Sequence, residues 1–151
     1  MKILNYGSIN IDVVFSVPRI VRPGETISSV RVRQFAGGKG ANQSVALAKA
    51  GAAVWQAGKI GEEDGWLLRK LAAHGVNTDL IRQYSGPSGQ AVIQVTPEAE
   101  NSIILSGGGN LAISKHEVDL ALSHFAKGDV LVVQNEINET PYIIQTERTK
   151  G

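Results

Sequence analysis

Short apolar runs alternate with runs of good helix formers along most of the chain. The apolar runs predict strands at residues 2–6, 52–57, 80–84 and 130–133. The helix formers predict helices at residues 41–50, 66–74, 114–125 and 140–150. Strands and helices in alternation are typical of an α/β fold. We therefore expect a mostly parallel sheet flanked by helices, in a Rossmann-type arrangement of three layers.

The last predicted strand, residues 130–133, is apolar at every position, which is typical of a strand covered on both faces. It should be an edge strand in this chain.

Capping signals mark the helices on either side of this strand. Ser114 and Glu117 have the spacing of a capping box, and Thr140 before Pro141 predicts an N-cap followed by proline at the first helical position.

Other segments alternate between apolar and polar residues and predict strands with one exposed face. Residues 26–35 show this pattern, and residues 90–96 and 101–105 flank a turn and predict a hairpin. Half-exposed strands fit poorly in a sheet that helices cover on both faces. We therefore expect a separate small antiparallel flap, built from residues of approximately 13–34 and 90–105.

A glycine-rich stretch, residues 34–43, opens the predicted helix at 41–50. Its sequence is Gln-Phe-Ala-Gly-Gly-Lys-Gly-Ala-Asn-Gln. Glycine lets a ligand approach the backbone, and the bare N–H groups at a helix start favour anions and polar oxygens. Lys39 and Asn42 add side-chain donors. We interpret the stretch as a binding site, and the alternative is a turn that merely closes a helix on a sheet.

Two phosphate-binding motifs do not fit this stretch. A Walker A loop requires Ser or Thr after its lysine, and Gly40 follows Lys39 here. A Rossmann turn requires a third small residue where this chain has Gln43.

Asn10 and Asp12 are two residues apart, just after the first predicted strand. In an extended chain they lie on one side, and Ile9, Ile11 and Val13 lie on the other. Open α/β sheets bind their ligands beyond the carboxyl ends of the strands, so this pair predicts a site there. The alternative is an Asx turn that caps the strand.

Size and charge narrow the function classes. The chain has 151 residues, is 42% hydrophobic and carries a net charge of +1, with both signs dispersed. One domain is the simplest interpretation, with no nucleic-acid or membrane surface. There is no cysteine, so disulfides and thiolate metal sites are excluded. With no signal peptide or transmembrane run in the sequence, we expect a cytoplasmic protein.

Four motifs resemble those of the ribokinase family, the phosphofructokinase-B-type carbohydrate kinases, in order and spacing. They are Gly-Ser-Ile-Asn-Ile-Asp at 7–12, Pro-Gly-Glu-Thr at 23–26, Gly-Gly-Lys-Gly-Ala-Asn-Gln at 37–43 and Gly-Lys-Ile-Gly-Glu-Glu-Asp at 58–64. The resemblance covers essentially all 151 residues. It implies a ribokinase-like fold, a β lid that closes over a sugar and pairs into a homodimer, and ATP-dependent phosphorylation of a sugar hydroxyl, with ribose the expected sugar.

The resemblance also implies which residues bind the sugar. They are Asn10, Asp12, Gly38, Lys39, Asn42 and Glu136, the last following the apolar run at 130–133. Sugar hydroxyls both donate and accept hydrogen bonds. Asp12 and Glu136 would accept, while Lys39 and Asn42 would donate.

One departure from the family is large. Its members are about twice as long, and their second half binds ATP with Mg²⁺ and a monovalent cation and carries a Gly-Ala-Gly-Asp motif with the catalytic base. Neither Gly128-Asp129 nor the glycine turn at 107–110 matches that motif. We therefore expect residues 1–151 to be the amino-terminal part of a ribokinase-like domain, lacking the nucleotide-binding half. Alone, this part should have no catalytic residue, bind no cofactor tightly and show no turnover.

Two other functions are weighed against this one. Gly107, Gly109 and Ala112 match a dinucleotide-binding pattern, with Asp129 about twenty residues on. However, the predicted helix starts only at residue 114, after the pattern. The second alternative is a non-enzymatic module that uses the flap as a dimerisation edge and has no affinity for sugar.

Overall fold

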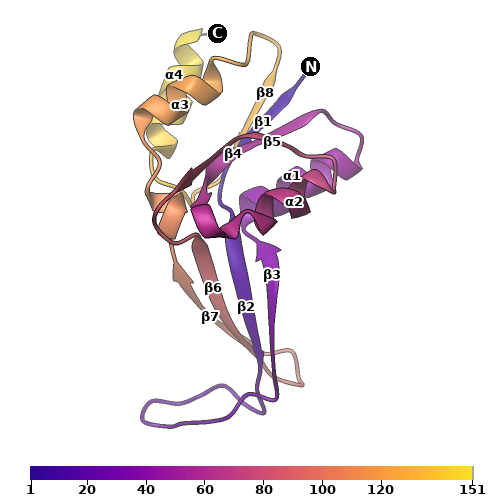
Figure 1. Ribbon diagram of the computed structural model, residues 1–151, viewed down its shortest axis with the longest axis vertical. Coiled ribbons are helices and arrows are strands. Elements are labelled where there is room, and N and C mark those ends of the chain that lie inside the picture. The colour runs from indigo at the N-terminus through magenta and orange to yellow at the C-terminus, as the bar shows by residue number, and fades with distance from the viewer. Residues whose placement is uncertain (151) are drawn as a thin grey trace.

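Two four-stranded sheets organise the chain in the computed structural model, which describes residues 1–150 (Figure 1). Sheet A has the strand order β5-β4-β1-β8, and every neighbouring pair in it is parallel. Its strands are β1 (Ile3–Tyr6), β4 (Val54–Gly61), β5 (Asn77–Tyr84) and β8 (Val130–Val133). Sheet B has the order β3-β2-β6-β7. Its strands are β2 (Asn10–Ser16), β3 (Arg31–Gly37), β6 (Gly89–Val95) and β7 (Asn101–Ser106).

The helices cover the two faces of sheet A, α1 and α2 on one side and α3 and α4 on the other (Figure 1). They are α1 (Lys39–Lys49), α2 (Trp66–Ala72), α3 (Lys115–Leu122) and α4 (Thr140–Lys150). Two short 3₁₀ helices, η1 (Glu62–Asp64) and η2 (Gly108–Leu111), complete the chain. The predicted three-layer α/β fold is confirmed.

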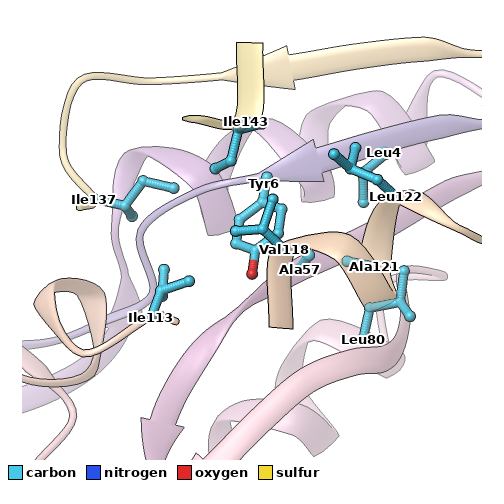
Figure 2. Packing of buried hydrophobic residues seen from close by; sticks show 10 residues of the cluster. All are labelled: Leu4, Tyr6, Ala57, Leu80, Ile113, Val118, Ala121, Leu122, Ile137 and Ile143. Atoms are coloured by element: carbon cyan, nitrogen blue, oxygen red, sulfur yellow. The ribbon is translucent and has the colours of Figure 1, made fainter. Parts of the chain in front are cut away.

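Each face of sheet A has its own apolar core. On one side Leu4 and Tyr6 of β1 pack with Val118 and Leu122 of α3 and Ile143 of α4 (Figure 2). On the other side the core contains the residues Ile9, Ile11, Ala41, Ile60, Leu67, Leu71, Val76 and Ile81. Burying a side chain of this size contributes about 1.5–3 kcal/mol. The two cores therefore hold the carboxyl edge of sheet A in place.

Sheet B confirms the predicted hairpin and corrects two expectations about the flap. β6 and β7 pair antiparallel, but β2 and β6 are parallel, so the flap is mixed. The reason is that β2 follows β1 and β6 follows β5, two strands that run the same way in sheet A. β3 begins at Arg31, five residues later than the predicted start at residue 26, because the exposed segment before it stays irregular.

Two boundaries differ from prediction because of tertiary contacts. The strand predicted at residues 52–57 extends further, because β4 continues to Gly61 and η1 begins only at Glu62. A Cβ on Gly58 would lie 2.9 Å from the carbonyl oxygen of Gly7, so this glycine serves close packing. At the other end of the chain, Thr140 is the first helical residue and its hydroxyl donates to the carbonyl of Ile137 at 3.1 Å.

The edge position of β8 is confirmed, since β8 pairs only with β1 in the part of the chain that the structure describes. The prediction that both faces of β8 are covered holds only in part. Val130 is 39% exposed and the next three residues are half-buried, because one side of the strand has no neighbour. None of the helices in residues 1–150 is long and apolar enough to cross a membrane.

Candidate functional site

The glycine-rich turn packs the start of α1 directly against the exit of β1. A Cβ on Gly40 would lie 2.6 Å from the carbonyl carbon of Gly7, so any larger residue would push the helix away. Gly38 has a φ of 95°, and a Cβ there would meet the carbonyl oxygen of Ser8 at 2.6 Å. The glycines therefore permit both the backbone conformation and the close approach. They bring Lys39 to the carboxyl edge of sheet A.

Buried amides hold this junction together. Asn5 Nδ2 donates to the carbonyl of Gly40 at 2.8 Å and to Ser44 Oγ at 2.9 Å, and Ser44 Oγ donates to Gln56 Oε1 at 2.6 Å. Gln134, just after β8, donates through Nε2 to Asn5 Oδ1 at 2.7 Å. These bonds tie β1, α1, β4 and the segment after β8 to one another. Hydrogen-bond networks of this kind favour a single arrangement, although Gln134 Oε1 is buried here without a partner in the described part of the chain.

Glu136 is held at this edge by two donors. Its carboxylate forms an ion pair with Lys39 Nζ and accepts a hydrogen bond of 2.7 Å from Ser8 Oγ. Burial raises the pKa of Glu136, but the hydrogen bonds from Lys39 and Ser8 outweigh it and hold the pKa below its usual range. Glu136 is therefore a charged acceptor at neutral pH.

Asn10 and Asp12 lie on one side of β2, while Ile9 and Ile11 enter the core on the other side, as the alternation predicts. Burial raises the pKa of Asp12, and the charge of Glu136 raises it further. A Cβ on Gly37, in β3, would lie 2.1 Å from Asp12 Oδ2. The glycine therefore leaves the room that this carboxylate occupies.

A hollow of about 330 Å³ lies between the start of β2 and the segment after β8. Its lining residues are Ser8, Asn10, Leu105, Ser106, Gly107, Asn110, Leu111, Asn135 and Glu136. The volume is at the lower end of the range of small-molecule sites. The lining combines acceptors and donors on one side with the end of β7 on the other, which suits a small polyhydroxylated ligand.

The six predicted site residues do not all line this hollow. Asn10 and Glu136 line it, and Lys39 is joined to Glu136. Asn42 is exposed and lines a different hollow of about 270 Å³, together with Phe35, Trp66 and His74.

Among the residues of the hollow that sequence reasoning missed, two are buried polar residues, Ser8 and Asn110. Ser8 is fully buried and Asn110 is 3% exposed. The only local signal for either was its position beside glycines, at the end of β1 and in the turn after β7. Their partners lie about a hundred residues away, Glu136 for Ser8 and Asn10 for Asn110. Such contacts leave no trace in a local pattern.

The dinucleotide-binding alternative does not fit the structure. Its residues, Gly107 to Ala112, enclose η2, which follows β7 of sheet B and precedes α3. A Cβ on Gly109 would lie 2.4 Å from the carbonyl oxygen of Lys59, so this glycine packs on β4. A dinucleotide site needs the motif between a parallel strand and the helix that it opens, whereas β7 is antiparallel to β6.

Comparison with known proteins decides the family. The model of the pfkB family carbohydrate kinases matches residues 1–147. The chain belongs to this family. It is 40% identical to the ribokinase of Haemophilus influenzae over 133 residues, which cover 86% of this chain and 44% of that protein. The chain spans about half the length of the curated relatives it matches.

Solved structures give the same family and fold. The ribokinase of Thermotoga maritima superimposes with a TM-score of 0.87 at 31% identity and covers all of this chain and 50% of its own. Arabidopsis thaliana ribokinase, solved with ribose and ATP, gives a TM-score of 0.82 at 27% identity over 99% of this chain and 51% of its own. The structural neighbours of this pfkB chain thus include several ribokinases, and some of these were solved with a nucleotide.

The residues described here do not fit the metal ion that the resemblance implies for the whole kinase. Within that part of the chain, no group of three or more Asp, Glu and His side chains is arranged to hold a metal. Glu136, the carboxylate on the hollow, is already ion-paired with Lys39.

Proposed function

We propose that this chain forms the sugar-binding half of an ATP-dependent kinase that phosphorylates a hydroxyl of ribose. The observation that carries the proposal is the polar edge of sheet A. There Glu136, bonded to Lys39 and Ser8, shares one hollow with Asn10. Asp12 lies two residues further along β2, near enough for the charge of Glu136 to raise its pKa.

The chemistry of these groups complements a sugar. Each hydroxyl donates one hydrogen bond and accepts others. The two carboxylates accept, while Lys39 and the side-chain amide of Asn10 donate. Asn42, which lines the neighbouring hollow, remains a proposed donor from the start of α1. Because buried polar groups left without a partner are costly, such a site rejects analogues that lack a hydroxyl. Membership of a carbohydrate kinase family and a relative solved with ribose and ATP support the choice of sugar and nucleotide.

In this proposal the chain binds and orients the sugar and does not itself transfer the phosphoryl group. Phosphoryl transfer depends on positioning and on stabilising charge around the nucleotide. The relatives that match are about twice as long as this chain. The proposal therefore places the catalytic base and the nucleotide site of the kinase outside residues 1–151. The place of action is the cytoplasm, which supplies ATP.

Sheet B is proposed to act as a lid over the sugar and to pair with a second copy. β2 and β6 leave the edge of sheet A beside the hollow, so a change in their angle would open or cover it. The edge strand β7 of sheet B exposes apolar side chains, among them Ile103 at 52% and Ile104 at 66%. Exposed apolar patches of this kind mark interaction surfaces.

The same patch supports one alternative, a dimerisation module with no sugar affinity. Calorimetric titration of the chain with D-ribose separates the two, with Asp12→Ala as the paired variant. Saturable heat that disappears in Asp12→Ala is expected for a sugar site. No heat from a chain with a folded circular dichroism spectrum, or heat unchanged in the variant, would contradict the sugar-binding proposal and favour the module.

A further inference from the structure

Asn110 is a buried asparagine at the point where sheet B joins sheet A. It lies in η2, four residues after the end of β7. Its side chain accepts a hydrogen bond of 3.0 Å from the backbone N–H of Ile9 and donates one of 2.7 Å to Asn10 Oδ1. Its carbonyl accepts from the backbone N–H of Asn138 at 3.1 Å. One residue thus links the start of β2 to the segments that follow β7 and β8.

These bonds define the orientation of two side-chain amides. The N–H of Ile9 can only donate, so the group that faces it must be the oxygen of Asn110. The NH₂ group of Asn110 therefore faces Asn10 and donates to its side-chain oxygen. The NH₂ group of Asn10 is left for other partners, and within the described part of the chain it has none. Asn10 lines the hollow, so this donor is available to a ligand there.

The surroundings hold Asn110 firmly in this position. A Cβ on Gly89, at the start of β6, would lie 2.2 Å from Asn110 Nδ2 and 2.4 Å from Asn10 Oδ1, so the two amides fill the space beside this glycine. Two residues after Asn110, the carbonyl of Ala112 accepts a hydrogen bond of 2.6 Å from Lys59 of β4. Lys59 also forms an ion pair of 2.8 Å with Glu117 of α3. Rotation of the Asn110 amide would break bonds on two sides.

We infer that Asn110 is a positioning residue, which sets Asn10 as a hydrogen-bond donor toward the sugar. The inference rests on the proposed function of the hollow. In this arrangement Asn10 donates a hydrogen bond to a sugar oxygen, and Glu136 accepts one from a sugar hydroxyl. A reversed Asn10 amide would present a second acceptor beside Glu136 and lose the donor.

Asn110→Asp tests the inference with almost no change in shape. The aspartate can still accept from the N–H of Ile9 but cannot donate to Asn10 as a carboxylate. The Asn10 amide is then expected to turn its NH₂ group toward the aspartate and its oxygen toward the hollow. Calorimetric titration with D-ribose should show a loss of affinity of about 10- to 100-fold, the effect of one buried hydrogen bond lost and an acceptor misplaced.

Asn135→Asp is the charge comparison. Asn135 lines the same hollow but is exposed, so the substitution places an equal charge at the hollow without removing a hydrogen bond to Asn10. The loss of ribose affinity should be clearly larger in Asn110→Asp than in Asn135→Asp. Equal losses in the two variants would assign the effect to charge and overturn the inference. Unchanged affinity in a folded Asn110→Asp chain would overturn it as well, and would leave the sugar-binding proposal standing.

A second measurement needs neither sugar nor the folding of a variant. In ¹⁵N-labelled wild-type protein, a side-chain NH₂ group that is hydrogen-bonded and buried exchanges slowly with water. The Asn110 NH₂ group should exchange more slowly than that of Asn10. The reverse order would overturn the inference. If the wild-type chain binds no ribose, the sugar-binding proposal fails, and the exchange order still decides the orientation of the two amides.

Discussion

The two sheets of this chain are built from similar numbers of apolar residues but are covered very differently. In sheet A, helices pack on both faces, and Leu4 and Ala57 are at most 1% exposed. In sheet B, Ile103 and Ile104 are more than half exposed on neighbouring positions of β7. A sheet buried on both faces stabilises the fold, whereas an open sheet leaves apolar side chains exposed for interaction with a partner. The candidate site lies at the boundary between them.

This difference explains where the polar groups of the site are placed. Asn10 begins β2 at the junction of the two sheets, and Glu136 follows β8 of sheet A. The rigid sheet holds Glu136 through Ser8, and the open sheet carries Asp12 on a strand that has solvent on one side. A site at such a junction combines fixed groups with groups that move when the open sheet moves.

The largest expected effect is on the core beneath sheet A. Leu67 of α2 is completely buried, and Leu67→Ala should lower the free energy of unfolding by about 2–5 kcal/mol, through lost transfer energy and a cavity. Urea denaturation followed by circular dichroism measures it. A loss below about 1 kcal/mol would show that this helix packs loosely, and the contrast between the two sheets would weaken.

The close approach of α1 to β1 gives the next effect. Gly40→Ala places a Cβ 2.6 Å from the backbone of Gly7, so the helix must shift, and we expect a loss of stability of about 1–3 kcal/mol together with weaker ribose binding. Gly65→Ala is the control. Gly65 has a helical φ of −55° and its nearest neighbour is a side-chain atom 3.8 Å away, so stability should hold or rise slightly. Similar losses in both variants would contradict the proposed close packing.

The pH dependence of ribose binding sharpens the comparison. Burial and the charge of Glu136 raise the pKa of Asp12, so its carboxylate takes up a proton at a higher pH than an ordinary aspartate does. If Asp12 accepts from the sugar, ribose affinity should decline as the pH is lowered through that raised pKa, before Glu136, whose pKa is lowered, is protonated. Titrations from about pH 7 down to about pH 4 measure it. Affinity that stays constant until an ordinary aspartate titrates would exclude Asp12 as the acceptor.

The pKa shifts of Asp12 and Glu136 have opposite effects on folding stability. The raised pKa of Asp12 means that the folded chain holds this proton more tightly than the unfolded chain, so Asp12 lowers stability as the pH rises through its folded pKa. Asp12→Asn should therefore be more stable than wild type at pH 7 while binding ribose less well. Glu136 contributes stability above its unfolded pKa and loses it as the pH falls, so Glu136→Gln should be less stable at pH 7. Denaturation curves of both variants at pH 7 check the signs.

The smallest effect on stability is expected in sheet B. Ile104 is 66% exposed, and Ile104→Ser should change the free energy of unfolding by no more than about 0.5 kcal/mol. If sheet B pairs with a second copy, the same substitution should weaken self-association, which sedimentation velocity measures. A large loss of stability with unchanged self-association would mean that β7 contributes to the fold and not to an interface.

The sequence by itself determined the elements whose signals are local. Gly51, with a φ of 90°, ends α1 because glycine enters that conformation without strain. Ser114 and Glu117 cap α3 as their spacing predicts. The alternation at the start of β2 correctly separated Asn10 and Asp12 from the apolar side chains that enter the core.

Only the tertiary structure decided what depends on strands meeting across the chain. β2 and β6 pair in parallel because each continues from a parallel strand of sheet A. β4 continues past its predicted end at residue 57, and its Gly58 packs closely on Gly7. The partners of Ser8 and Asn110 lie 128 and 100 residues away, at Glu136 and Asn10. A local pattern records how a segment folds and which face it buries. The orientation of an amide in a binding site is set by donors that arrive from elsewhere in the fold.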